Sequence, residues 1–530
     1  MSRELRTGAR RCGRRRTDGA SDRRTPARSG VGSCRTRDGA VSMSVWFVPK
    51  DAAAKSVGAD QIAERLIAQG EVVIRTGSRG LLWLEPLVEW SDDRYGDRVG
   101  WCNVTAEQCL DVLPATGDGN FLGAVEDLDY LARQQRWIFE RVGIIDPLDG
   151  DDFLYRGGLA GLKQALAMTP HDVVEAIVES GLRGRGGAGF PAGIKWRTVA
   201  AQEPVAHAGS GAGAAKHKYI CVNADEGDSG TFADRMLMEG DPFCLIEGMV
   251  IAAWAVGADL GIVYLRSEYP DAIATLEQAL DEARERGWLG ANILGSGFGF
   301  DVEIRIGAGS YVCGEETAML ESIEGRRGMV RVKPPLPAIK GLFGTPTVIN
   351  NVLTIASVPS IMARGSEAYA ALGHGRSCGT QVFQLAGNIA RGGIVETAFG
   401  VTARALVHDF GGGTRSGRPV RAVQTGGPLG PYLAADELDV PMAYEALADA
   451  GGMLGHGGLV VFDDTVDMLE QARFAMEFCA EESCGKCTPC RIGAVRGVEV
   501  LERIAAGDDA IQQQVLLRDL CEVMEMGSLA

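Results

Sequence analysis

An alternation of apolar strands and amphipathic helices between residues 218 and 323 constrains the fold of this chain more than any other feature of its sequence. Short runs rich in Val, Ile and Leu alternate there with longer segments of helical periodicity. We expect strands at 218–223, 261–265 and 302–306 and helices at 242–256, 271–286 and 315–323. This order predicts a parallel sheet covered on both faces, with ligands bound beyond the carboxyl ends of the strands.

Three further domains are expected on either side of this α/β domain, which we place at residues 131–375 of the 530. Residues 43–130 show a strand, helix, strand, strand order that is typical of a thioredoxin-like unit. Residues 376–464 hold short β-rich runs between glycine clusters and predict a small α+β domain. Residues 465–530 predict helices around one cysteine-rich loop. The segments of the first domain lie at 45–48, 59–69, 71–75 and 80–89, and the β-rich runs of the third at 380–385, 420–424 and 459–462.

Charge is distributed unevenly along the chain, whose net charge is −17. Residues 1–42 hold 12 Arg and four Asp or Glu, so the rest of the chain is more acidic than the whole. Nucleic-acid binding by this acidic part is not expected, because it requires clustered Lys and Arg. No apolar run reaches the roughly 20 residues that span a bilayer. We expect a cytoplasmic enzyme subunit, with residues 1–42 as a disordered tail or as sequence upstream of a true start at Met43.

A glycine-rich loop at residues 184–189 contains the spacing Gly-x-Gly-x-x-Gly. Such glycines let backbone N–H groups approach a phosphate or a flat ring closely, and the following Lys195 can add a positive charge. The loop does not directly follow a clear strand, as the usual dinucleotide fingerprint requires. A structural turn is therefore an equally good interpretation of the loop alone.

Polar residues follow two of the expected strands. Asp225, Glu226 and Asp228 lie just beyond the first, where three carboxylates repel one another unless they are solvated or face donors on a ligand. Cys313 to Glu316 follow the strand at 302–306 in the same way. Both segments are expected at the ligand crevice. The alternatives are a solvated polar loop and, for Cys313, a small packing residue.

Three cysteines in a loop with Gly and Pro carry the most specific signal in the sequence. Cys484, Cys487 and Cys490 recur at intervals of three residues and can bind three irons of a cubane cluster. A zinc site more typically shows two separated pairs of ligands. A fourth ligand is needed, and Cys521 is the only thiol further along the chain. Cys102 and Cys109 in the first domain have no second pair nearby and are expected to be ordinary cysteines.

Five ordered motifs together resemble the NADH-oxidising flavoprotein subunit shared by respiratory complex I, NAD-linked hydrogenases and NAD-linked molybdenum formate dehydrogenases. They lie at 184–196, 221–230, 307–335, 348–352 and 483–491. An N-terminal thioredoxin-like extension without cluster-binding cysteines most resembles the beta subunit of the NAD-dependent formate dehydrogenase. The resemblance implies a Rossmann-like FMN and NADH domain, a small ubiquitin-like (SLBB) domain and a helical [4Fe-4S] domain.

The resemblance also implies which residues hold the cofactors. Phe190 and Lys333 would contact NADH, while Glu226 and Glu316 are expected to be catalytic. The cluster would bind Cys484, Cys487 and Cys490, with a fourth family cysteine at the position of Ala530, so we expect a truncated or altered C-terminus with Cys521 as a stand-in ligand. The implied cofactor-binding residues are Gly184, Arg185, Gly186, Gly187, Ala188, Gly189, Phe190, Lys195, Asn223, Asp225, Glu226, Asp228, Gly314, Glu315, Glu316, Lys333, Asn350 and Asn351.

We therefore expect an oxidoreductase subunit that exchanges hydride between NAD(H) and FMN and passes single electrons to or from a [4Fe-4S] cluster. The first choice of parent complex is an NAD-dependent formate dehydrogenase, and complex I or an NAD-linked hydrogenase is the alternative. The implied partners are a thioredoxin-like ferredoxin (gamma-type) subunit and a large iron–sulfur/molybdopterin catalytic subunit. A rival hypothesis of another class is a structural subunit that has kept degenerate motifs without cofactors.

Overall fold

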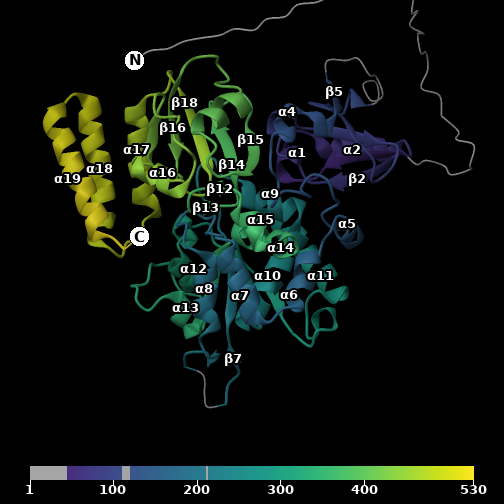
Figure 1. The fold of residues 1–530 in the computed structure, drawn as a ribbon. Coiled ribbons are helices and arrows are strands. Elements are labelled where there is room, and N and C mark those ends of the chain that lie inside the picture. Colours follow the sequence, from purple (N-terminus) through teal and green to yellow (C-terminus); the bar gives the residue numbers. More distant parts are fainter. Residues whose placement is uncertain (1–43, 110–119, 210–212, 530) are drawn as a thin grey trace, which may run out of the picture. The chain divides into compact units, whose positions relative to one another are not determined.

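The computed structural model describes residues 44–109, 120–209 and 213–529. The expectations for residues 1–42 and for Ala530 lie outside the described residues. From Ser44 onward the chain forms one compact unit, with three sheets of four or five strands and a group of C-terminal helices (Figure 1).

The N-terminal sheet has the strand order β2-β1-β3-β4-β5. Strands β1 and β2 are parallel, and all other neighbours are antiparallel. Ile62 and Leu66 of α2 pack on Trp46 and Trp101 of this sheet, which confirms the thioredoxin-like unit. The strand expected at 80–89 is mostly wrong, because a 3-10 turn occupies Leu82–Leu84 and β3 begins only at Val88. The elements are β1 Val45–Pro49, α1 Ala52–Ser56, α2 Ala59–Ala68, β2 Val72–Thr76, β3 Val88–Ser91, β4 Val99–Trp101 and β5 Phe121–Ala124.

The second sheet is fully parallel, as the strand and helix alternation predicts. Its order is β10-β9-β8-β11, so the chain steps outward from β8 and then returns to place β11 on the other side of β8. This reversal creates a switch point between β8 and β11, where parallel sheets bind ligands. The strands are β8 Tyr219–Ala224, β9 Leu260–Arg266, β10 Asp301–Gly307 and β11 Thr347–Asn351.

Helices cover both faces of this sheet because both faces of its strands are apolar. Ile220 and Val222 of β8 point into the larger core, which includes α10, α11 and α14. Tyr219 and Cys221 point to the opposite face and pack with Met319 and Leu320 of α12 in a smaller core. The helices are α10 Pro242–Val256, α11 Pro270–Glu285, α12 Glu316–Ile323 and α14 Val352–Arg364.

Further helices surround the sheet and frame the glycine-rich loop. The loop runs between α7 and α8, so it follows a helix and not a strand. This part of the chain contains α4 Asp129–Ala132, α5 Gly150–Tyr155, α6 Ala160–Leu166, α7 Pro170–Glu179, α8 Ala192–Ala200, α9 Ala233–Gly240, α13 Pro337–Lys340 and α15 Ser366–Ala370.

The third sheet has the order β15-β14-β18-β16-β17. Its two central strands, β14 and β18, are parallel, and the outer neighbours are antiparallel. The three β-rich runs expected from the sequence correspond to β14, β16 and β18. The elements are β14 Thr380–Gly387, β15 Gly393–Ala398, a π-helix at Ala405–Phe410, β16 Val420–Thr425, β17 Tyr432–Ala434, α16 Tyr444–Asp449 and β18 Gly458–Asp463.

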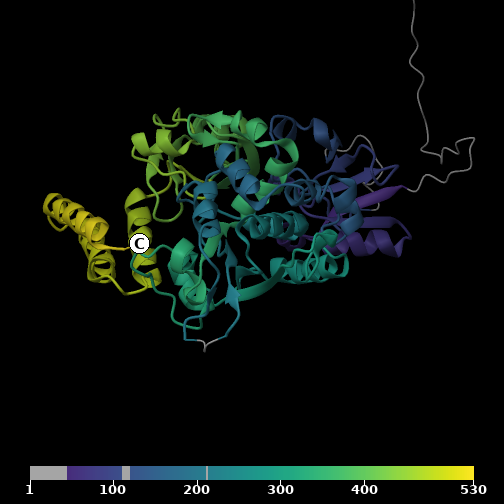
Figure 2. The same cartoon turned by 60° about the horizontal axis from the view of Figure 1, so that its bottom comes forward.

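Three helices end the chain: α17 Met468–Glu482, α18 Thr488–Ala506 and α19 Ala510–Gly527. Figures 1 and 2 show α18 and α19 side by side, and the cysteine-rich loop joins α17 to α18. Gly493 of α18 permits this close pairing, because a Cβ atom there would lie 2.5 Å from Met524 Cγ. Among the described residues, no helix has both the length and the apolar character needed to cross a membrane.

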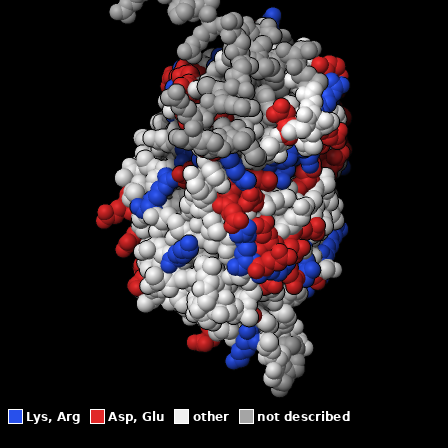
Figure 3. Space-filling view, turned by 90° about the vertical axis from the view of Figure 1, so that its right-hand side faces the viewer, with Lys and Arg blue, Asp and Glu red and all other residues white. Residues whose placement is uncertain are grey.

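Charged side chains of both signs cover much of the surface. On the face drawn in Figure 3, acidic and basic side chains lie next to one another between larger uncharged areas. Many of them form surface ion pairs, such as Arg286 with Asp151 and Glu282. Exposed pairs of this kind contribute little stability.

Candidate functional site

The switch point brings the ends of β8 and β11 to one edge of the parallel sheet. Asn223 Oδ1 accepts from the backbone N–H of Asp225 at 3.1 Å, and Asn223 Nδ2 donates to the carbonyl of Gly314 at 2.7 Å. Asn351, at the end of β11, caps α14 by accepting from the N–H of Leu353. These amides therefore hold the loops after β8 and β10 and the start of α14 in one place.

The glycine-rich loop approaches the same edge. A Cβ atom at Gly186 would lie 2.9 Å from Asn351 Cβ, so only glycine permits this close approach. Gly187 has a φ of +117°, which side-chain-bearing residues rarely adopt. The loop thus presents bare backbone at the switch point, as its sequence predicts.

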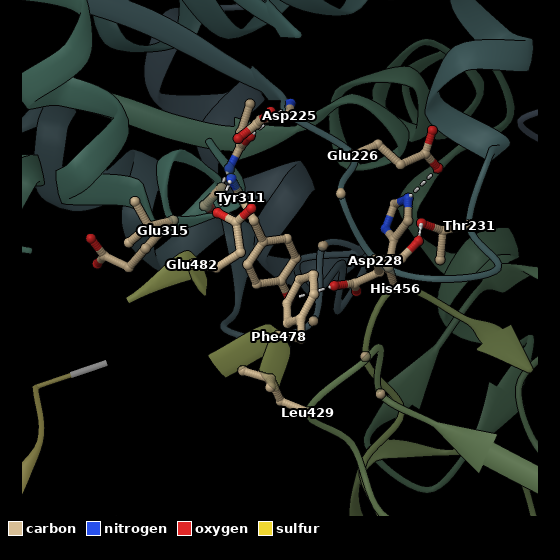
Figure 4. Close-up of a pocket in the computed structure, with 18 of the residues that line it drawn as sticks. Asp225, Glu226, Asp228, Thr231, Tyr311, Glu315, Leu429, His456, Phe478 and Glu482 are labelled. Carbon is tan, nitrogen blue, oxygen red and sulfur yellow. Dashed lines mark hydrogen bonds and ion pairs between the residues drawn. The ribbon is translucent and has the colours of Figure 1, made fainter. Parts of the chain in front are cut away.

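A cavity of about 390 Å³ lies between these loops, the small third-sheet domain and α17 (Figure 4). Its lining joins segments that are far apart in the sequence, from the glycine-rich loop to the cysteine-rich loop. The lining residues are Gly186, Gly187, Asn223, Asp225, Glu226, Gly227, Asp228, Thr231, Asp234, Tyr311, Val312, Gly314, Glu315, Asn351, Gly426, Leu429, Met453, Gly455, His456, Phe478, Cys479, Glu482, Ser483, Cys484 and Cys490.

Carboxylates dominate the charge of this cavity. Burial raises the pKa of Asp225 to about 7, although Arg266 opposes the shift. Asp225 Oδ2 is buried and has no hydrogen-bond partner among the described residues. Burial also raises the pKa of Asp228, whose Oδ1 accepts a hydrogen bond from the Tyr311 hydroxyl at 2.7 Å. An unpartnered carboxylate oxygen in such a place is suited to accept an N–H or O–H from a ligand.

Glu226 has protein partners for both of its carboxylate oxygens. It accepts from the backbone N–H groups of Asp234 and Arg235, both at 3.1 Å, and so caps α9. Its Oε1 also lies 3.2 Å from Nε2 of His456, a contact visible in Figure 4. Burial alone would raise the pKa of Glu226, but His456 and these N–H groups hold it below its usual value.

A second charged group lies beside the cavity without lining it. Lys195 Nζ donates to the carbonyl of Ile349 at 2.8 Å and pairs with Glu316 at 3.5 Å. Lys333 Nζ lies 2.8 Å from Glu316 and 3.0 Å from Glu315. Burial lowers the pKa of Lys195, while the two lysines keep that of Glu316 low despite its burial. These lysines are the nearest candidates to meet a phosphate group.

The cysteine-rich loop places its thiols at the N-terminal end of α18. Cys487 immediately precedes the helix and Cys490 lies in its first turn, while Cys484 lies in the loop. All three are partly buried. Cys479, near the end of α17, lines the cavity together with Cys484 and Cys490. Three thiols gathered at one helix end fit three irons of a cubane cluster.

Comparison with known proteins decides the family. A model of the Nuo51 FMN-binding domain matches residues 177–360, and a model of the NADH-ubiquinone oxidoreductase-F iron-sulfur binding region matches residues 470–529. The F 2 component of the NADH-quinone oxidoreductase of Rhizobium meliloti is 49% identical over 367 residues, which cover 69% of this chain and 85% of that protein. The chain belongs to the Nuo51 flavoprotein family of NADH-quinone oxidoreductases.

Members and structural relatives of the Nuo51 family occur in more than one kind of enzyme. The NADP-reducing hydrogenase subunit HndC of Solidesulfovibrio fructosivorans is 46% identical over 393 residues, covering 74% of this chain and 78% of that protein. A solved NAD+-reducing [NiFe]-hydrogenase in its H2-reduced state matches with a TM-score of 0.63 and 29% identity, covering 93% of this chain and 80% of that chain.

Membership of the Nuo51 family makes this chain an oxidoreductase component with FMN, NAD(H) and a [4Fe-4S] cluster as cofactors. The cavity fits FMN on two observations. The unpartnered Asp225 Oδ2 can accept a hydrogen bond from the ligand, and the bare backbone at Gly186 and Gly187 leaves room for a flat ring. The cysteine-rich loop fits the cluster through its three thiols.

Not all of the residues implied by the sequence reach the cavity. Arg185 is fully buried, and its guanidinium donates to the Tyr369 hydroxyl and to the carbonyls of Cys378 and Thr380. Asn350 accepts from the indole N–H of Trp196 at 2.9 Å. Phe190 is half exposed. The implied residues outside the cavity lining are Gly184, Arg185, Ala188, Gly189, Phe190, Lys195, Glu316, Lys333, Asn350 and Cys487.

Several lining residues were missed from the sequence. Tyr311 follows β10 in the chain, so its position beyond a parallel strand is a signal that could have revealed it. His456, Phe478, Cys479 and Glu482 come from the third-sheet domain and α17, which no local pattern links to the parallel sheet. Cys313 is buried in the smaller core beside the sheet, in agreement with its interpretation as a packing residue.

Proposed function

We propose that the chain exchanges hydride between NAD(H) and FMN at the switch point and exchanges single electrons with the cluster at the cysteine-rich loop. One observation carries this proposal: a single cavity is lined both by the glycine-rich loop and by Cys484 and Cys490. A ligand in that cavity lies next to the cluster ligands, and short separation is what electron transfer between two centres needs. FMN supplies the conversion between two-electron and one-electron chemistry.

We assign the residues of the flavin site by what each can offer. Gly186 and Gly187 leave room for the ring, Asn223 orients Asp225, and Asp225 accepts a hydrogen bond from the ligand. Lys195 is placed to meet the phosphate, by exchanging its contact with Glu316. Glu226 and Glu316 remain predicted catalytic residues, and both would act by orienting groups around the ligand.

We place NADH on the open side of the same site. The side chain of Phe190 is half exposed and offers an aromatic surface for stacking. Lys333, now paired with Glu315 and Glu316, offers a positive charge for the nucleotide phosphates. Both contacts are assignments that rest on the sequence motifs and on this exposure.

We propose an NAD-dependent formate dehydrogenase as the parent complex, with a ferredoxin-like and a molybdopterin-containing subunit as partners. The support is the thioredoxin-like N-terminal domain, in which Cys102 and Cys109 are both buried as ordinary packing residues. The second candidate is an NAD-linked hydrogenase, which is favoured by the match of a solved hydrogenase to 93% of this chain.

Two measurements on the purified protein test the catalytic proposal. Stoichiometric FMN with NADH-dependent reduction of an artificial dye is expected, and a colourless protein without dye reduction would support the structural rival. For the parent complex, the subunits that copurify with a tagged chain should include a molybdopterin protein, and the assembly should reduce NAD+ with formate. Reduction of NAD+ with H2 instead would favour the hydrogenase.

A further inference from the structure

His456 is the one basic side chain among the residues that line the cavity. The same lining contains six carboxylates: Asp225, Glu226, Asp228, Asp234, Glu315 and Glu482. His456 is also one of the most buried polar residues, with a relative exposure of 5%. A buried acidic cavity that must hold an electron-accepting ring makes the charge of this imidazole important.

The partners of His456 determine its protonation. Nδ1 lies 2.8 Å from the carbonyl oxygen of Arg185, and because a carbonyl only accepts, Nδ1 carries a proton. Nε2 lies 3.2 Å from Glu226 Oε1 and 3.2 Å from Asp234 Oδ1. Both ring nitrogens therefore face acceptors.

Both carboxylates have surroundings that suit their ionised forms. Glu226 accepts the two backbone N–H groups at the start of α9, and Asp234 Oδ2 accepts from Asn351 Nδ2 at 2.7 Å. Burial alone would lower the pKa of His456, but Asp234 and Glu226 outweigh it and raise that pKa well above the usual value. An imidazolium held between two carboxylates satisfies every group in the cluster.

The backbone around His456 is built to bring it there. Gly455 has a φ of +59°, and a Cβ atom on it would lie 2.4 Å from Gly426 Cα. Gly457 has a φ of +85°, and its Cβ would lie 2.5 Å from Gln381 Nε2. The two glycines therefore let a turn of the third-sheet domain reach the flavin domain, where His456 contacts the glycine-rich loop, the residue after β8 and α9.

We infer that His456 is a positioning residue that stays protonated, fixes Glu226 and the Arg185 carbonyl beside the flavin, and raises the reduction potential of bound FMN. This inference rests on the proposed flavin site. The physical reason is that electrons added to the ring are stabilised by a nearby positive charge in a poorly solvated cavity. Without it, the surrounding carboxylates would disfavour reduction.

A charge series tests the inference. His456→Gln removes the positive charge, Asp234→Asn removes one negative charge, and the double variant removes both. The midpoint potential of bound FMN should fall in His456→Gln, rise in Asp234→Asn and return near the wild-type value in the double variant. His171→Gln, on the exposed face of α7, is the matched control and should leave the potential unchanged. Equal potentials across the series would overturn the inference.

Two measurements on the FMN-free protein separate this inference from the flavin assignment. The six histidines can be followed by ¹⁵N NMR, and the signal that vanishes in His456→Gln should keep the pattern of a doubly protonated ring well above the ordinary titration range. The melting temperature should fall in His456→Gln and recover in the double variant. If the wild type binds no FMN but these results hold, the proposed function fails and the imidazolium stands.

The same histidine and carboxylates could instead hold a metal, since their ligand atoms lie within 4.8 Å of one another. Metal analysis of the purified protein distinguishes the two cases. We expect the iron content to be the same in the wild type and His456→Gln, and no other stoichiometric metal. A metal present in the wild type and lost in His456→Gln would overturn the imidazolium. If His456→Gln does not fold, the comparison of Asp234→Asn with the double variant still measures the charge of His456.

Discussion

The Tyr311 hydroxyl donates a hydrogen bond to Asp228 Oδ1 at 2.7 Å, and this bond ties the loop after β10 to the loop after β8. The same tyrosine connects to the cluster-bearing helices. Its backbone N–H donates to Glu482 at 2.9 Å, and its ring packs edge-on against Phe478 at 4.8 Å between centroids. Tyr311 is therefore the contact through which the position of α17 reaches the flavin cavity.

Replacing Tyr311 with Phe removes the donor to Asp228 and keeps the ring. An unpaired buried carboxylate should lower the free energy of unfolding by about 1–3 kcal/mol. Urea denaturation measures the loss, and the Tyr311→Phe, Asp228→Asn pair forms a double-mutant cycle. If the two changes prove additive, the bond contributes nothing to stability.

Substitution of Gly314 should remove the flavin without damaging the backbone. Gly314 lines the cavity, its φ is not in the left-handed region, and an added Cβ would meet only the Asp225 carbonyl at 3.4 Å. Gly314→Val should therefore lower FMN content strongly while the melting temperature changes little. Gly187→Val should also lose FMN, but the φ of Gly187 adds backbone strain to that variant.

A matched control for Gly314→Val is Gly184→Ala. Gly184 lies in the glycine-rich loop but not in the cavity lining, and an added Cβ would come no closer than 3.7 Å to another atom. It should keep its flavin. Full FMN in Gly314→Val, measured by absorbance after release, would contradict the placement of the ring in this cavity.

Asp225 should make stability and flavin binding depend on pH. Its pKa is raised from 3.8 to about 7 in the folded state, so between these values the folded protein binds more protons than the unfolded one. Stability therefore falls as pH rises across this window. Asp225→Asn should flatten this part of the profile, which thermal unfolding of the FMN-free protein at several pH values would show.

Flavin binding should have the opposite trend. A donor on FMN favours the ionised Asp225, so affinity should rise as pH passes through about 7. Asp225→Asn should weaken FMN binding and remove this dependence, as followed by quenching of flavin fluorescence. The same rise in the variant would show that another group is responsible.

The fourth cluster ligand can be identified by iron analysis. Cys521 lies exposed on α19, whereas Cys479 lines the cavity with Cys484 and Cys490. With Ala530 at the family position of the fourth cysteine, we expect the cluster to lose iron in air towards a three-iron form. Cys521→Ser should then change nothing, and a cysteine at Ala530 with a family-like extension should restore stability.

Electron paramagnetic resonance and iron content check this expectation, with Cys378→Ser as a control outside the cluster-bearing segment. Four irons held stably in air would contradict it. In that case Cys479→Ser and Cys521→Ser decide between the two thiols, since loss of the fourth iron in one variant identifies that residue as the ligand.

Glu226→Ala shows how the structure changes an expectation from the sequence. The position of Glu226 beyond β8 predicts a larger loss of activity than of stability. In the structure Glu226 caps α9 and pairs with His456, so its removal also leaves a buried charge without a partner, at about 3–5 kcal/mol. Dye reduction and melting temperature should therefore both fall, and an unchanged melting temperature would contradict this role.

The strands of the parallel sheet were predictable where both faces are apolar, as in β8, whose Ile220 and Cys221 point to opposite cores. Strand β11 was not foreseen as a strand, because Thr347 and Asn351 leave only a short apolar run. Asp225 and Gly186 could be placed at the site because parallel strands end at one edge. His456 could not, since its position depends on how the third-sheet domain packs on the flavin domain, and periodicity carries no such information.

The buried Arg185 links the glycine-rich loop to the chain that leads into β14. Its guanidinium donates to the carbonyls of Cys378 and Thr380, and it lies 4.7 Å from the centre of the Phe399 ring. The boundary near residue 376 therefore separates two segments of sequence but not two folding units. Removal of residues 376–464 would leave this arginine without acceptors, so the flavin loop and the small domain should unfold together in one cooperative step.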